Sequence, residues 1–136
     1  MTGLVIQLKP HEKFLVNGVV LQNGDRRNRI RIRSKGASVL RMSDMLHPVE
    51  AITPAKHVYY LAQLAVLGLA DAETTRLAII ERMPALRVAY AAPDADGAVC
   101  ACEAALADGK LFAAMRALKK LFPLDGAPSV FGGASQ

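Results

Sequence analysis

The chain has 136 residues but no tryptophan, only seven aromatic residues and only two cysteines. Two cysteines exclude a disulfide-dense secreted scaffold. The longest mostly apolar run, residues 58–70, is too short to cross a bilayer, which takes about 20 residues. The first 15 residues include Lys9, Glu12 and Lys13 and lack the apolar core of a signal peptide. We therefore expect a cytoplasmic protein with no membrane partner.

Sequence motifs of catalysis are also missing. The chain contains no phosphate-binding glycine loop, no Ser-His-Asp spacing and no paired catalytic carboxylates. Cys100 and Cys102 are two positions apart, so on a helix they point in different directions, and every histidine lies far from them. We expect a protein that is not an enzyme, with no catalytic residue, no metal site and no cofactor.

The positive charge is concentrated in the first half of the chain. The formal net charge is +5, and 52% of the residues are hydrophobic, which excludes a wholly disordered protein. Residues 1–60 contain 10 basic and 4 acidic residues, whereas residues 61–136 contain 7 basic and 8 acidic ones. A local basic excess indicates a polyanionic partner: nucleic acid, anionic lipid or an acidic protein surface.

Short apolar runs separated by turn residues predict a small antiparallel β domain, a sheet or a barrel, in residues 1–47. Asn17-Gly18 lies between two such runs, which is the strongest short hairpin signal because both turn residues need a positive φ. Residues 28–33 alternate between polar and apolar side chains, as in a half-buried strand. The expected strands lie at residues 4–8, 14–16, 19–21, 28–33 and 37–40.

Residues 53–123 predict a bundle of about four helices, and the fold class is therefore α+β. Thr53-Pro54 is a helix start, with threonine as N-cap and proline at the first helical position. Pro84 should end the second helix, and the residues from Ala92 to Gly97 should form a break. The expected helices cover residues 54–67, 71–83, 98–107 and 110–122, followed by a mobile tail at residues 124–136.

A run of basic residues is the strongest functional signal in the chain. Arg29, Arg31 and Arg33 share one face of the expected strand, while the isoleucines between them point into a core. Arginine dominates the run, and its planar guanidinium suits bidentate contacts with phosphate. The candidate RNA-binding residues are Arg26, Arg27, Arg29, Arg31, Arg33, Lys35 and Arg41.

Two other readings of this basic run remain open: a solvated edge strand that discourages aggregation, or a surface for an acidic protein. The run contains no aromatic residue that could stack on a base. RNA binding here would depend on phosphate contacts and would therefore be strongly salt-dependent and modestly sequence-specific. The helices also offer more apolar surface than the core needs, which suits a protein partner or a homo-oligomer.

The N-terminal half resembles the FlbT family of flagellin regulators. The resemblance covers residues 4–64 and returns weakly at residues 118–121. It rests on Leu8–Lys13, Asn17-Gly18, Gln22–Arg26, Val39–Arg41, Asp44, Pro48, Thr53–Ala55 and Tyr59.

The resemblance implies a cytoplasmic regulator of bacterial flagellum biogenesis. Proteins of this family associate with the 5′ untranslated leader of flagellin mRNA, repress its translation and promote its degradation, often alongside a second small regulator, FlaF. In some bacteria the family's effect on flagellin synthesis is positive, so both repression and activation are compatible with the resemblance. The alternative hypothesis is a non-enzymatic adaptor or chaperone-like factor that binds flagellin or a second flagellar regulator through its helical surface.

Overall fold

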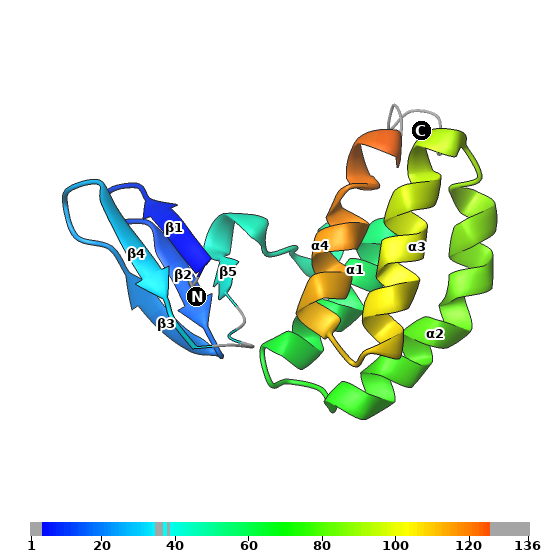
Figure 1. Cartoon of the computed structure of the whole chain (residues 1–136), viewed down its shortest axis with the longest axis horizontal. Coiled ribbons are helices and arrows are strands. Elements are labelled where there is room, and N and C mark those ends of the chain that lie inside the picture. Colours follow the sequence, from blue (N-terminus) through cyan, green and yellow to red (C-terminus); the bar gives the residue numbers. More distant parts are fainter. Residues whose placement is uncertain (1–3, 35–36, 38, 126–136) are drawn as a thin grey trace. The chain divides into compact units, whose positions relative to one another are not determined.

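The computed structural model describes residues 4–34, 37 and 39–125 and has an α+β fold (Figure 1). Antiparallel strands come first and four helices follow, which confirms the predicted fold class. The chain divides into two compact units, residues 1–45 and residues 46–136. We call the first the β unit and the second the helical unit.

The β unit contains two small sheets where a single sheet or a barrel was expected. The first sheet pairs β1 with β4, and the second has the order β3-β2-β5, with every pairing antiparallel. The strands are β1 Leu4–Leu8, β2 Lys13–Val16, β3 Val19–Gln22, β4 Asn28–Ile32 and β5 Val39–Arg41.

The predicted hairpin at Asn17-Gly18 is present between β2 and β3. Asn17 has a φ of 51° and Gly18 a φ of 83°, the positive values that a type I′ turn requires. Val16 pairs with Val19 directly beside the turn. The local sequence therefore sets the register of this pair of strands.

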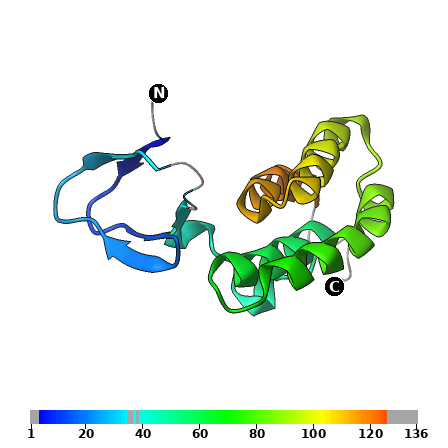
Figure 2. The ribbon, with the colours of Figure 1, turned by 60° about the horizontal axis from the view of Figure 1, so that its bottom comes forward.

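Apolar side chains from both sheets form the core of the β unit. Ile6 and Leu8 of β1 pack with Phe14 of β2 and Val39 of β5, and Ile30 and Ile32 of β4 cover them partly. Figure 2 shows the two sheets facing each other. Because alternate residues of a strand point to opposite faces, the residues between the isoleucines of β4 are turned outward.

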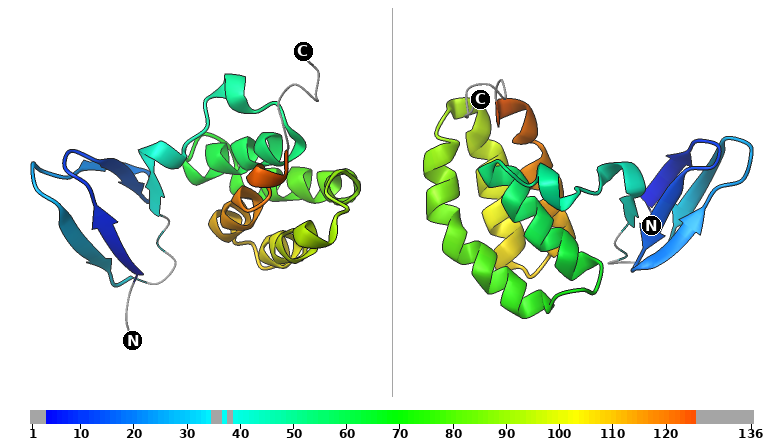
Figure 3. Two further views of the ribbon diagram at one scale, coloured as in Figure 1. Left: turned by 90° about the horizontal axis from the view of Figure 1, so that it is seen from above. Right: turned by 180° about the vertical axis from the view of Figure 1, so that it is seen from behind.

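The helical unit is a ring of four helices. Each helix packs against the next one along the chain, and α4 returns to pack against α1 (Figures 1 and 3). Its largest fully buried side chains include Ile79, Leu106, Met115 and Leu118. No helix among the described residues is both long and apolar enough to cross a membrane. The helices are α1 Pro54–Val66, α2 Ala72–Ala89, α3 Pro93–Ala107 and α4 Leu111–Lys119.

Three short 3₁₀ helices complete the described structure. They are Met42–Asp44 in the β unit, and Pro48–Glu50 and Phe122–Asp125 in the helical unit. The last one takes up the start of the expected tail, residues 124–136, whose remainder lies outside the described residues.

The start of α1 is as predicted, but two expected helix boundaries were wrong. The Thr53 side chain accepts a hydrogen bond from the Lys56 backbone N–H at 3.2 Å. In contrast, α2 does not end near Pro84 but continues through it to Ala89. Proline removes one intrahelical hydrogen bond, yet buried side chains on both sides of it, Ile79 and Leu86, hold the helix against its neighbours.

The expected break from Ala92 to Gly97 is instead the first part of α3. Pro93 occupies the first helical position, where its missing N–H costs no hydrogen bond. Asp94 and Asp96 lie in the first turn, where carboxylates interact favourably with the helix dipole. The prediction of a break failed because proline and aspartate, which are typical of loops, are also typical of the first turn of a helix.

Candidate nucleic-acid interface

The outer face of the β1–β4 sheet carries two of the candidate arginines. Arg29 pairs with Gln7 and Arg31 with Val5, and all four residues are exposed. Arg33 is also exposed, but β4 ends one residue before it. The predicted alternation therefore holds for Arg29 and Arg31, whereas Arg33 lies outside the strand.

Arg26 and Arg27 lie exposed in the loop between β3 and β4. The Asn23 side-chain amide fixes this loop, because its Nδ2 donates to the Lys9 carbonyl at 2.7 Å and to the Arg26 carbonyl at 2.8 Å. Nδ2 of Asn28 in turn donates to Oδ1 of Asn23 at 3.0 Å. These bonds hold the backbone that carries both arginines next to the start of β4.

An open hollow of about 690 Å³ lies where the end of β1 meets the start of β4. Seven described residues line it, of which four are basic and none carries a carboxylate. A concave surface of this kind raises the local concentration of anions. The lining residues are Gln7, Leu8, Lys9, Arg27, Asn28, Arg29 and Arg41.

Arg41 differs from the other arginines of the β unit because its guanidinium is already engaged. Its Nη1 donates to Oε2 of Glu12 at 2.9 Å, and its Nη2 donates to the Gln7 carbonyl at 2.7 Å. Oε1 of Glu12 accepts a hydrogen bond from the Lys9 backbone N–H at 2.9 Å. Arg41 therefore ties β5 to β1 and to the turn after it, while still lining the hollow.

Five other candidates have no such partner among the described residues. Among the described residues, no ion pair is present for Arg26, Arg27, Arg29, Arg31 or Arg33. Lys35, the other candidate, lies outside the described residues. Five exposed arginines are thus available to an anionic ligand.

The hollow contains polar residues that the sequence analysis did not select: Gln7, Lys9 and Asn28. They line it because β1 pairs with β4, and the paired residues are at least 20 positions apart in the chain. Hydrophobic alternation indicates that a segment is a strand but not which strand it pairs with. Sequence alone carried no signal for their placement.

Neither cysteine of the expected third helix belongs to this surface. Burial raises the pKa of the Cys102 thiol to about 12, so it stays protonated and unreactive at neutral pH. In the part of the chain that the structure describes, no three His, Cys, Asp or Glu side chains gather closely enough to hold a metal ion.

Comparisons with known proteins point to one family. Residues 4–127 match the family model described as "Flagellar protein FlbT". The "Flagellum biosynthesis repressor protein FlbT" of Caulobacter vibrioides is 46% identical over 70 residues, which are 52% of this chain and 49% of that protein. The "Probable flagellum biosynthesis repressor protein FlbT" of Mesorhizobium japonicum is 25% identical over 122 residues, which are 90% of this chain and 82% of that protein.

The match with the Caulobacter relative spans about half of that protein's length, whereas the family model spans most of this chain. No solved structure matches significantly. Because the family model accounts for nearly all of the residues that the structure describes, the chain belongs to the FlbT family of flagellar proteins.

Proposed function

We propose that the protein is a cytoplasmic, non-enzymatic regulator of flagellin synthesis. It binds the 5′ untranslated region of flagellin mRNA, represses translation and promotes degradation of the message. Two findings support this proposal: membership of the FlbT family, and relatives that are named flagellum biosynthesis repressors. The flagellar role comes from the relatives, the mRNA leader as target comes from the family resemblance, and the charge of the β unit supports contact with a polyanion.

The observation that carries the proposal is the set of exposed arginines beside the hollow. Guanidinium groups bind phosphate oxygens in a bidentate fashion, and none of the described residues that line the hollow has a carboxylate to compete with the ligand. Arg29 and Arg31 are two residues apart on β4, a spacing of about 6.6 Å along the strand. That distance is close to the spacing of successive phosphates in an extended nucleic-acid strand, so the row suits a single strand better than a compact anion.

The test is a titration of labelled flagellin leader RNA, and of a scrambled RNA of equal length, at several salt concentrations. Contact with five phosphates predicts a slope of about −3.5 for log affinity against log salt. The double variant Arg29→Gln/Arg31→Gln should flatten that slope by about 1.4 and weaken binding about tenfold.

The matched control is Arg82→Gln/Lys110→Gln, which removes the same charge from exposed sites of the helical unit. This control variant should show the same salt slope as the wild-type protein. Equal, weak binding of both RNAs by the wild-type protein would contradict the proposal. If both double variants bind the leader with the same affinity and the same salt slope, Arg29 and Arg31 do not contact the RNA.

A second candidate function is favoured by the outer face of α2. Leu77, Ile80, Pro84 and Val88 are exposed and follow helical spacing, on the side opposite the buried Ile79. An apolar stripe of this kind suits an adaptor that binds flagellin, a FlaF-type regulator or a second copy of the chain. In that case Ile80→Glu would abolish flagellin control in cells, while the arginine variant would keep it.

A further inference from the structure

Strand β3 forms one edge of its sheet. It pairs with β2 on one side, and no described strand pairs with it on the other. All four of its residues are exposed, and the exposed fractions of Val19, Val20 and Leu21 are 58%, 60% and 42%. An exposed apolar edge is a template for pairing with another strand, so proteins commonly protect such an edge with charges, proline or a bulge.

The edge formed by β3 has none of these protections. Between Lys13 and Asp25 the sequence contains no charged residue and no proline. The pairing of β2 with β3 is continuous and contains no bulge. Arg29 and Arg31, by contrast, lie on β4 in the other sheet. The edge therefore suits a partner strand that is itself apolar and uncharged.

The hydrogen bonds of the hairpin indicate which backbone groups of β3 point to the open edge. The Asn23 backbone N–H donates to the Glu12 carbonyl at 2.9 Å. In an antiparallel pair, hydrogen-bonded positions recur at every second residue, so in this register Leu21 directs its N–H and C=O groups to β2. Val20 and Gln22 direct theirs away from β2, towards the open edge.

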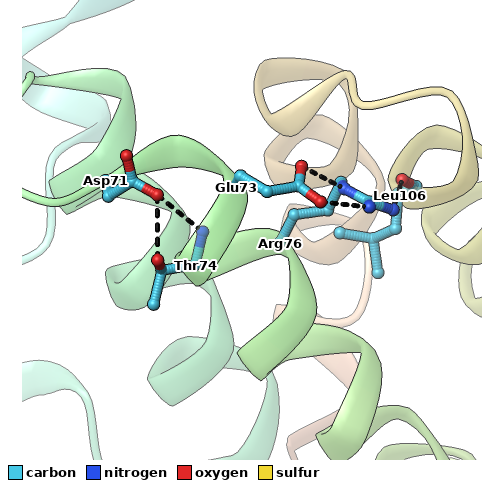
Figure 4. Close-up of polar contacts among 5 residues, drawn as sticks. All are labelled: Asp71, Glu73, Thr74, Arg76 and Leu106. Atoms are coloured by element: carbon cyan, nitrogen blue, oxygen red, sulfur yellow. Dashed lines mark hydrogen bonds and ion pairs between the residues drawn. The ribbon is translucent and has the colours of Figure 1, made fainter.

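In the helical unit, side chains bind backbone groups that the helices leave free at their ends. At the start of α2, Oδ2 of Asp71 accepts a hydrogen bond from the Thr74 backbone N–H at 2.9 Å (Figure 4). At the end of α3, the Leu106 carbonyl accepts one from Nη1 of Arg76 at 3.2 Å. Among the described residues, no side chain does the same for the outward groups of β3, which are therefore available to another strand.

The strand that matches this edge is a second copy of β3. If two copies pair antiparallel with Leu21 at the centre, Val20 of each copy lies opposite Gln22 of the other. Each Val20–Gln22 pair then exchanges two hydrogen bonds, which satisfies all the outward groups. The two Leu21 side chains meet on the face that also carries Phe14, with their Cβ atoms about 4.5–5.5 Å apart.

We propose that β3 is a self-association surface, through which two copies of the chain join their three-stranded sheets into one antiparallel sheet. This inference goes beyond the proposed function and does not depend on RNA. A two-fold symmetric contact uses the same surface on both copies, and β3 meets that requirement because it pairs with itself in register. A standard protein interface uses about 20–30 residues a side, whereas β3 has four, so the dimer is weak and reversible.

The test is sedimentation equilibrium of the full chain, without RNA, over a range of protein concentrations. The measured mass should rise from 14.6 kDa towards twice that value as the concentration increases. Leu21→Lys places two like charges opposite each other and should raise the dissociation constant of the dimer about tenfold. The matched control is Ile52→Lys, which adds the same charge at a side chain of the helical unit that is 73% exposed. This control should dimerise like the wild-type protein.

A mixture of two variants tests the register and separates a lost contact from a damaged fold. Leu21→Lys and Leu21→Glu should each dimerise poorly, but their equimolar mixture should form a heterodimer because opposite charges then face each other. A wild-type chain that stays monomeric up to about 1 mM would overturn the inference. So would a mixture that stays monomeric, or equal weakening by Leu21→Lys and Ile52→Lys. Because no RNA is present, the proposed function stands or fails independently of these results.

Discussion

Arginines of the β unit differ in role according to what surrounds them. Arg29 is exposed and has no ion pair among the described residues, whereas Arg41 is held by Glu12 and by the Gln7 carbonyl. Substituting Arg41 would leave the largely buried Glu12 carboxylate without its ion-pair partner, so a loss of RNA binding in that variant would not separate a lost contact from a damaged fold. Arg29 and Arg31 are therefore the cleaner test of an RNA contact.

Tyr90 is a residue whose stabilising role depends on pH. Its hydroxyl accepts a hydrogen bond from the Ala55 backbone N–H at 3.0 Å and donates one to the Asp125 carboxylate. Burial, with a further contribution from Asp125, raises the pKa of Tyr90 to about 12. An unfolded tyrosine titrates near 10. The stabilising contribution of Tyr90 is thus fully present below about pH 10 and is lost as the pH rises towards 12.

The variant Tyr90→Phe should lower the free energy of unfolding by about 1–2 kcal/mol at neutral pH, because it removes both hydrogen bonds. Between pH 10 and 12 its stability should approach that of the wild-type protein. Urea unfolding at several pH values measures both effects. A difference that stays constant up to pH 12 would contradict this account.

Among the helices, α2 is one in which tertiary contacts outweigh the tendency of a proline to end a helix. Pro84 lies exposed in the middle of the helix, and residues buried on either side of it belong to the core of the helical unit. The helix thus persists at the expense of one backbone hydrogen bond, the one that the Ile80 carbonyl would accept.

Replacing this proline should therefore stabilise the protein. Proline is about 3 kcal/mol less favourable than alanine inside a helix, and part of that difference is offset because proline restricts the unfolded chain. We expect Pro84→Ala to raise the free energy of unfolding by about 1–2 kcal/mol in a urea titration. Ala85→Gly, at the neighbouring exposed position, should lower it by about 1 kcal/mol. A loss of stability in Pro84→Ala would show that the helical unit needs the proline here.

At the scale of the whole molecule, each compact unit contains buried apolar side chains of its own. Ile6, Leu8, Phe14 and Val39 form one cluster within residues 1–45, and the largest fully buried side chains all belong to residues 46–136. The hollow and its arginines lie in the β unit.

Residues 46–136 should therefore fold when expressed alone. Their circular dichroism should be that of a helical protein, and their thermal unfolding should be cooperative. Residues 1–45 are close to the size of about 40 residues below which a chain rarely folds unaided, so we expect the isolated β unit to be marginal. Non-cooperative melting of residues 46–136 would mean that the helical unit depends on the β unit for its stability.

Features that depend on neighbours in the chain were predictable from the sequence. The Asn17-Gly18 turn, the Thr53 cap and the inward isoleucines of β4 follow from backbone preferences and side-chain periodicity within a few residues. The arginine-rich run could likewise be identified directly from the residues between positions 26 and 41. The helix boundaries were misplaced near prolines, because proline occurs both at the start of a helix, as Pro93 does, and inside one, as Pro84 does.

The α+β order of elements, the excess of positive charge and the alternation of β4 were predictable without the structure, since each depends on local residues. Three features became apparent only in the folded chain: the pairing of β1 with β4, the ion pair of Arg41 with Glu12, and the open hollow beside Arg27 and Arg29. These features join segments distant in the chain. Their free energy comes from packing and hydrogen bonds that exist only after the chain has folded, and no local pattern records them.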